Sequence, residues 1–196
     1  MSEAEPLPIL VFPDPFLAKR ARPVTVEELK TGRADGWDLS ELTHRMQASV
    51  AAEQGLGLAA TQVGVGLRLF LAKVAKDNAD ALVVINPVFS ELRGSAVEEE
   101  GCLSLPGVRA KVKRYTSLHL DGMNLKGEPL SFDAQDLFAR ICQHEKDHLD
   151  GVLFVNRLGM AARLLVRRQL AELEADYELA LKRKKQRRAV AVGKQA

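Results

Sequence analysis

Gln143-His144-Glu145-Lys146-Asp147-His148 sets two imidazoles four residues apart, with a carboxylate beside the first. On an α-helix this spacing stacks both histidine rings on one face, within reach of a single metal ion. Glu145 then stands where a general base for metal-bound water is expected. The motif therefore predicts a metal site on a helix.

The residues around the motif predict the extent of that helix. Leu137, Phe138 and Ile141 recur at helical spacing before the histidines, and Gly151 follows as a stop signal. The predicted helix runs from Asp133 or Asp136 to Leu149. Because apolar residues accompany the motif, we expect this helix to be buried at the centre of the fold.

Periodicity predicts the other elements. An N-terminal helix carries Leu39, Leu42, Met46 and Val50, with Asp38 or Ser40 as its cap. A C-terminal helix runs from about Met160 into the basic tail. Strands are predicted between these helices at residues 67–74, 81–89, 108–115, 117–123 and 129–132. The fold class is therefore α+β, with antiparallel β-sheets packed around a central metal-binding helix.

Length and composition indicate one ordinary globular domain. The chain has 196 residues, of which 46% are hydrophobic and 28% charged, and it lacks an apolar run long enough to span a bilayer. The first five residues are acidic where a signal peptide is basic, so we expect a cytoplasmic protein without a membrane partner. Cys102 and Cys142 are expected to be free thiols.

Charge is distributed unevenly along the chain. Residues 182–196 hold seven basic and no acidic residues, which leaves 21 basic against 26 acidic residues in the remainder. We therefore divide the chain into a catalytic domain, 1–181, and a basic tail, 182–196. Such a tail suits a polyanion such as RNA, but it is equally typical of a solvated helix end.

A third protein ligand is needed beside the two histidines, and its identity decides the enzyme class. Metalloproteases with a third histidine six residues after the second are excluded, because position 154 is Phe154. A zinc endopeptidase with a distal glutamate remains an alternative, with Glu172 or Glu174 as the ligand. Both glutamates also fit the polar face of an amphipathic helix.

The other soft donor is a cysteine. Cys142 lies roughly 200° around the helix from His144 and so points away from the metal face. Cys102 lies in Glu-Gly-Cys-Leu-Ser, between Gly101 and Pro106, and a buried small residue is an equally good interpretation of it. His44 and His119 lie on polar faces of their predicted elements. Cys102 is the stronger candidate.

A third segment, residues 55–64, reads Gly-Leu-Gly-Leu-Ala-Ala-Thr-Gln-Val-Gly. Alone this segment is weak evidence for a binding site, because it lacks the glycine spacing of a dinucleotide site and the lysine of a phosphate loop. Together with Glu-Gly-Cys-Leu-Ser and the histidine motif, in this order and at these separations, it closely resembles the three signature motifs of bacterial peptide deformylases. The resemblance extends from about Leu7 to Leu158.

This resemblance implies a metal centre and a reaction. Cys102, His144 and His148 match the family's ligands for one divalent ion, natively Fe(II) and replaceable by zinc, nickel or cobalt, with water in the fourth position. The substrate implied is the N-formyl group of a nascent methionyl peptide, which is hydrolysed to formate. Metal-bound water is expected to attack the formyl carbon, with Glu145 as general base and then general acid.

The same resemblance implies the roles of further residues. The Gln62 side-chain amide and the Leu103 backbone N–H match the donors that hold the tetrahedral oxyanion. The peptide is expected to pair as an added strand beside Leu56 and Gly57. Leu137 and Ile141 are candidates for its methionine pocket, although core packing explains both equally well.

The basic tail leaves two further hypotheses open. In a deformylase it would bind the ribosome and bring the enzyme to nascent chains. Alternatively, the whole protein is a non-enzymatic RNA-binding or ribosome-binding module with a structural metal. Structural zinc sites usually have four protein ligands, and the sequence offers only three good ones. The enzyme hypothesis is therefore preferred.

Overall fold

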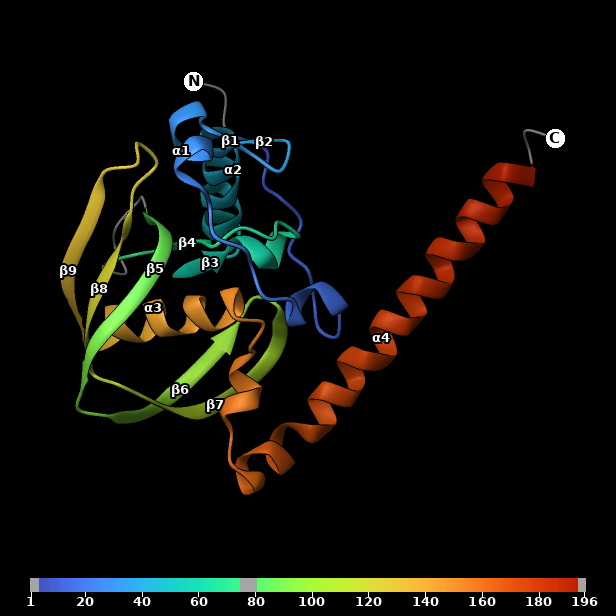
Figure 1. The fold of residues 1–196 in the computed structure, drawn as a ribbon. Helices are drawn as coiled ribbons and strands as arrows, with labels where there is room; N and C mark the ends of the chain where they lie inside the picture. Colours follow the sequence, from blue (N-terminus) through green and yellow to red (C-terminus); the bar gives the residue numbers. More distant parts are fainter. Residues whose placement is uncertain (1–3, 75–80, 194–196) are drawn as a thin grey trace.

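The computed structural model describes residues 4–74 and 81–193, and its fold is α+β, as predicted (Figure 1). Its helices are α1 (Val26–Thr31), α2 (Leu39–Ala52), α3 (Asp136–Leu149) and α4 (Met160–Gly193), with 3-10 turns η1 (Pro15–Ala18), η2 (Ala60–Val63) and η3 (Phe154–Arg157). Its strands are β1 (Arg33–Ala34), β2 (Trp37–Asp38), β3 (Gly57–Ala59), β4 (Leu69–Ala72), β5 (Leu82–Arg93), β6 (Ala96–Cys102), β7 (Leu105–Arg114), β8 (Ser117–Met123) and β9 (Pro129–Gln135).

The strands form antiparallel sheets around α3. A five-stranded sheet has the order β3-β4-β5-β8-β9, while β6 and β7 form a separate hairpin and β1 and β2 a very short one. Helix α3 runs between the larger sheet and the β6–β7 hairpin (Figure 1). A helix enclosed in this way can present side chains to both layers, which is what a central metal-binding helix requires.

Helix α3 is buried, and it ends where the sequence predicts. Ala139, Cys142 and Leu149 are completely buried in the core that the helix shares with the five-stranded sheet. Gly151 follows with a φ of 73°, and a Cβ there would lie 2.5 Å from the carbonyl oxygen of Ala18. A side chain at position 151 would therefore clash with the backbone of Ala18 and would also be strained at this positive φ. Both reasons favour glycine here.

Helix α2 confirms the second helix prediction. Asp38 is its N-cap, with a side-chain oxygen that accepts a hydrogen bond from the Glu41 N–H at 3.0 Å. The four apolar residues that predicted the helix are all buried in a core on the other side of β3 and β4: Leu39, Leu42, Met46 and Val50. This packing fixes the segment that follows, which carries β3 and the Gly-rich motif.

Several element boundaries differ from the predictions. The helix start at Asp133 is wrong, because β9 continues to Gln135 and α3 begins at Asp136. β5 extends to Arg93 and β7 starts at Leu105, whereas β4 covers only Leu69–Ala72 of the predicted 67–74. Strand β6 and helix α1 were not predicted. The extended strands continue past their apolar runs because neighbouring strands still supply backbone partners there.

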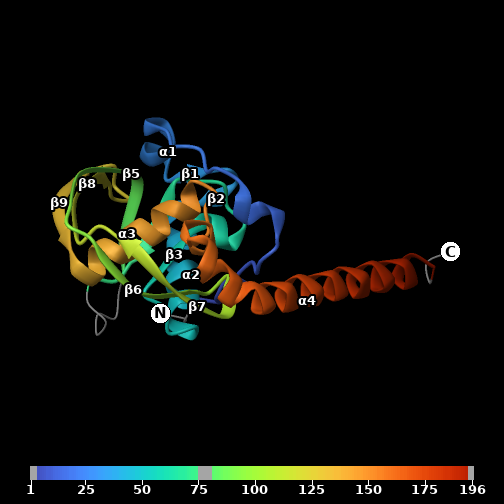
Figure 2. The same cartoon turned by 90° about the horizontal axis from the view of Figure 1, so that it is seen from below.

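Helix α4 leaves the body of the protein after its first half (Figures 1 and 2). In that first half Val166 of α4 is buried, and Leu170 and Leu173 of the same helix pack against the core that Val166 enters. Further along, the Tyr177 hydroxyl donates to Asp14 Oδ2 at 3.2 Å, and Leu181 is 40% exposed. The helix continues through residue 181, so the proposed division there stays a prediction. Within the described residues, α4 and the shorter helices are too polar or too short to cross a bilayer.

Candidate metal centre

Three side chains from two elements converge as a candidate metal site. Cys102 ends β6, while His144 and His148 lie one turn apart on α3. One donor atom from each lies within 4.8 Å of the other two, and Cys102 Sγ is 3.2 Å from His148 Nε2. Within the described residues, no other group of three such side chains converges in this way.

The orientation of His144 is fixed by a carboxylate. His144 Nδ1 lies 3.1 Å from Oε2 of Glu100, a buried residue of β6. Because this contact occupies Nδ1, the other ring nitrogen is left to serve as the ligand. The ring also stacks on Phe154, with 6.2 Å between centroids. Glu100 thus determines which nitrogen of His144 faces the metal site.

Glu100 is itself held by two arginines. Arg114 donates to both of its oxygens, at 2.9 and 3.0 Å, and Arg140 donates to one at 2.7 Å. Burial opposes ionisation of Glu100, but the contacts with His144 and Arg114 outweigh it and lower its pKa to about 2. The lowered pKa keeps Glu100 a charged acceptor for His144 near neutral pH.

The ion pairs extend beyond Glu100 to the far side of α3. Arg114 also donates to Asp147 Oδ2 at 2.5 Å, and Arg157 from η3 donates to Asp147 Oδ1 at 2.5 Å. Asp147 lies on α3, one residue before the candidate ligand His148. The network therefore ties α3 to β6, β7 and η3, and fixes its position relative to Cys102.

His148 is suited to bind a metal as a neutral imidazole. Burial, together with the positive charges of His144 and Arg114, lowers its pKa well below the ordinary value. Its backbone carbonyl accepts a hydrogen bond from Thr61 Oγ1 at 3.1 Å, which links the helix to η2. His148 Nδ1 is buried and has no hydrogen-bond partner among the described residues.

The donor set fits a divalent ion. One sulfur and two imidazole nitrogens are borderline-soft ligands of the kind that bind zinc and other first-row divalent metals. Burial opposes protonation of His144, but its contacts with Cys102 and Glu100 raise its pKa well above the ordinary value. A metal ion would displace the proton that His144 holds beside Cys102, since metal binding releases protons from the ligands.

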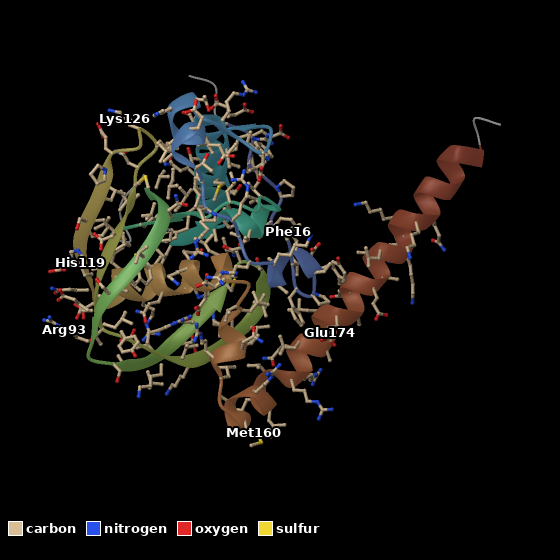
Figure 3. All side chains as sticks on the ribbon, in the orientation of Figure 1. Phe16, Arg93, His119, Lys126, Met160 and Glu174 are labelled. Atoms are coloured by element: carbon tan, nitrogen blue, oxygen red, sulfur yellow. The ribbon has the colours of Figure 1, made fainter. Side chains whose placement is uncertain are left out.

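The distal-glutamate alternative is not favoured. Glu172 accepts a hydrogen bond from Arg168 at 2.8 Å on exposed α4. Glu174 also lies on α4, away from α3 (Figure 3). Two predictions that excluded other candidate ligands are also confirmed. Cys142 is completely buried in the core, and His119 contacts Asp133 on the outer face of the sheet.

Glu145 is buried beside the three donors and lies directly over Gly57 of β3. A Cβ at position 57 would be 2.5 Å from Glu145 Oε1. Its other oxygen, Oε2, finds no hydrogen-bond partner in the part of the chain that is described. Burial is the main reason that the pKa of Glu145 rises to about 7. A carboxylate in this state can accept and release a proton near neutral pH.

Gln62 is held with its amide nitrogen toward the cysteine. Its Oε1 accepts from the Ala59 N–H at 2.8 Å, and its Nε2 lies 3.1 Å from Ser104 Oγ and 3.6 Å from Cys102 Sγ. The first contact fixes the amide orientation, so the donor side of the amide faces the candidate site. Gln62 is 2% exposed, which makes this orientation rigid.

A cleft of about 560 Å³ opens in front of these residues. Its walls include Gln62, Cys102, His144 and Glu145, and its size suits a small ligand or a peptide side chain. The candidate peptide-binding residues and Leu103 also line it: Leu56, Gly57, Leu103, Leu137 and Ile141. His148, in contrast, lies buried behind the wall. The cleft thus joins the candidate metal site to the candidate peptide site.

Glu100, Arg114 and Arg140 were missed as functional residues by sequence reasoning. Glu100 is the last of three consecutive glutamates, and it is the one that is buried. Its position two residues before Cys102 was the available signal, because strand alternation directs residues i and i+2 to the same face. The arginines gave no comparable signal.

Comparison with known proteins agrees with this geometry. A family model described as polypeptide deformylase matches residues 6–163. The chain belongs to this family. A peptide deformylase of Acidobacterium capsulatum is 40% identical over 175 residues, which cover 87% of this chain and 97% of the relative. Deformylases are hydrolases that remove the formyl group from nascent peptides, so the predicted enzyme class is confirmed.

Solved deformylase structures share the fold. A plant peptide deformylase superposes with a TM-score of 0.81 at 32% identity and covers 89% of this chain and 92% of its own. A peptide deformylase from Legionella pneumophila gives a TM-score of 0.74 at 33% identity, with 88% and 98% covered. The deformylase likeness therefore includes the sheets and α3, which together position the candidate site.

Proposed function

We propose that Cys102, His144 and His148 hold one divalent metal ion and that the adjoining cleft hydrolyses the formyl group of N-formylmethionyl nascent peptides. The observation that carries this proposal is the convergence of the three donors beside Glu145. Three protein ligands leave a coordination position free for chemistry. When bound, the ion would activate water and polarise the formyl carbonyl.

Glu145 is the proton carrier in this proposal. Its buried carboxyl, with a pKa raised to about 7, accepts a proton from the attacking water. It then returns the proton to the nitrogen of the departing amine, so that the products are formate and a free amino terminus. The same carboxyl serves both steps because it releases the proton as readily as it accepts it.

Gln62 and the backbone N–H of Leu103 are proposed to hold the oxyanion. The orientation of Gln62, with its nitrogen toward Cys102 and Ser104, supports this role because a donor faces the reacting region. A fixed donor costs no reorganisation when charge develops, and losing one typically costs about 3 to 4 kcal/mol of transition-state stabilisation.

The peptide is proposed to bind along β3 as an added strand. β3 is the edge strand of the five-stranded sheet, so one side of its backbone is available for pairing. Leu56 and Gly57 lie there, while Leu137 and Ile141 from α3 form the apolar wall that would receive methionine. The 36% exposure of Leu137 supports this role, since a residue used only for core packing would be buried.

Two finer assignments follow from the family resemblance. We take Fe(II) as the native ion, with zinc, nickel or cobalt able to replace it, because the thiolate and imidazole set accepts all of them. We place the activity in the cytoplasm, where nascent chains are made. We further propose that the basic tail, 182–196, binds ribosomal RNA through its seven cationic side chains.

The test of the proposed reaction is formate release from a formyl-Met peptide by the metal-loaded enzyme. Glu145→Gln is expected to lower the rate by at least about 100-fold while keeping its metal, because the variant cannot accept a proton. Glu172→Gln is the control, since a distal-glutamate endopeptidase would need that residue. An undiminished rate in Glu145→Gln would refute the role of the base.

The tail is tested separately by ribosome co-sedimentation at low salt. Removing residues 182–196 should abolish association and leave formate release from a short peptide unchanged, because the tail lies outside the cleft. Association that persists without these residues would contradict the ribosome proposal. It would leave the deformylase assignment in place.

A further inference from the structure

A second cleft, of about 650 Å³, lies against another side of α3. We call it the rear cleft; its walls are Phe89, Leu92, Gly94, Ser95, Lys113, Arg114, Tyr115, Gln143, Lys146, Asp147 and Arg157. The α3 residues that line it project roughly 130° around the helix axis from those that line the active cleft. The two clefts have no lining residue in common.

One wall of the rear cleft is apolar and partly open to solvent. Leu92 from β5 is 43% exposed and Tyr115, at the end of β7, is 46% exposed. Phe89 lies beside them, with Lys146 Nζ 5.7 Å from the centre of its ring. An aromatic or aliphatic group bound here would cover surface that is now in water, which is favourable.

A second group of lining residues is cationic. Lys113, Arg114, Lys146 and Arg157 line the cleft, against Asp147 as the only carboxylate among the lining residues. Asp147 already accepts hydrogen bonds from Arg114 and Arg157 through both of its oxygens. Its negative charge is therefore compensated from within the protein.

The cations differ in how far they are compensated. Lys146 pairs with Asp150 at 2.7 Å, outside the cleft wall, and Arg114 is held by Glu100 and Asp147. Lys113 has no hydrogen bond or ion pair through its side chain within the described residues. Arg157 is paired on one side, but its side chain is 51% exposed. Lys113 and Arg157 therefore offer donors to an incoming anion.

We infer that the rear cleft is a binding site for a small organic anion, namely a phosphate monoester with an aromatic or aliphatic body. The anionic group binds at Lys113 and Arg157, and the body lies against Leu92 and Tyr115. A volume of about 650 Å³ is that of an ordinary small-molecule site. This site is separate from the proposed deformylation and does not depend on it.

The test is titration of the full-length, zinc-loaded protein, labelled with ¹⁵N, with phenyl phosphate. Saturable shifts are expected at the amides of Gly94, Ser95 and Tyr115. Inorganic phosphate and phenol should each bind more weakly than phenyl phosphate, because the first lacks the aromatic ring and the second lacks the phosphate group. Equal affinity for inorganic phosphate and phenyl phosphate would show that the apolar wall takes no part, and would overturn the inference.

Two matched charge reversals test the cationic wall. Lys113→Glu should raise the Kd for phenyl phosphate about tenfold, as expected for loss of one charge-assisted hydrogen bond. Lys126→Glu makes the same charge change on the exposed β8–β9 turn, far from the end of β5 (Figure 3), and should leave the Kd unchanged. Equal weakening in both variants would indicate general charge attraction and refute the site.

A third variant covers the apolar wall and does not depend on Lys113. Leu92→Ala should weaken phenyl phosphate several-fold and leave inorganic phosphate unaffected, because only the aromatic body contacts this residue. Shifts confined to residues of the active cleft, such as Gly57 and Leu103, would show that the probe binds at the metal centre and would also refute the inference.

Discussion

Glu145 and Gly57 are in direct contact: the carboxyl of Glu145 occupies the space where a side chain at position 57 would begin. A Cβ there would lie 2.5 Å from Oε1 and 2.8 Å from Cδ. Glu145 is only 4% exposed and its carboxyl lines the cleft, so a Cβ at position 57 would push that carboxyl out of its present place. The glycine of the Gly-rich motif therefore sets the position of the proposed base.

The contact predicts that Gly57→Ala impairs catalysis. Displacing the carboxyl from its place should lower kcat/KM for a formyl-Met peptide by about 100-fold, since misplaced catalytic groups cost that much. Gly159→Ala is the control, because nothing lies within 4 Å of a Cβ at that position. Steady-state formate release measures both. Wild-type kcat/KM in Gly57→Ala would show that the contact has no catalytic importance.

Glu100→Gln is expected to weaken metal binding about 10- to 100-fold, because Glu100 orients His144 and partners of metal ligands have effects of this size. The variant should also be less stable, since buried Arg114 and Arg140 lose a charged partner. Competition with a chelator measures the affinity. Glu99→Gln, on an exposed neighbouring residue, is the control, and equal affinities in the two variants would contradict the role of Glu100.

The ion pair of Glu28 and Arg22 predicts a dependence of stability on pH. Arg22 donates to Glu28 at 2.6 and 2.9 Å and, as the main cause, lowers the pKa of Glu28 from 4.5 to about 2. A carboxyl whose pKa is lower in the folded state stabilises the protein at pH values above its unfolded-state pKa. This stabilisation is lost as the pH falls toward the folded-state pKa.

The wild type should therefore exceed Glu28→Gln in urea midpoint at pH 7. The difference should shrink as the pH falls from about 4.5 to about 2, because Glu28 then becomes protonated in the wild type as well. Glu27→Gln, on an exposed residue of the same helix, should show little difference at any pH. A difference in urea midpoint between the wild type and Glu28→Gln that stays constant down to about pH 2 would contradict the proposed role of the Arg22–Glu28 ion pair.

Helices α2 and α3 could be predicted from sequence because each carries its own signals. Leu39, Leu42, Met46 and Val50 follow helical spacing and are all buried. Asp38 supplies the cap of α2, and Gly151 ends α3. Such signals lie within a few residues of one another, so a single sequence contains them.

Strand β6 could not be predicted in the same way. It reads Ala-Val-Glu-Glu-Glu-Gly-Cys, and Glu100 is the one buried residue among its seven. Its stability comes from pairing with β7, where Glu99 lies opposite Lys111. A partner in a different segment leaves no periodic pattern in the strand itself. Helix α1 was missed because it has only six residues, although its Thr25–Glu28 capping box is present.

The same limit applies to the candidate site. The histidine pair could be read from spacing on one helix, and Cys102 and Gln62 from the family motifs that carry them. Glu100, Arg114 and Arg140 come from β6, β7 and α3, and their contacts arise only when these elements meet. Sequence reasoning therefore found the proposed ligands and missed the residues that orient them.

The most direct test of the central claim is the metal content per chain of anaerobically purified Cys102→Ala, with wild type and Cys142→Ala beside it. The wild type and Cys142→Ala should each hold about one divalent ion, because Cys142 lies in the core away from the site. Cys102→Ala should hold far less than one. A full equivalent of metal in Cys102→Ala would contradict a centre made by Cys102, His144 and His148.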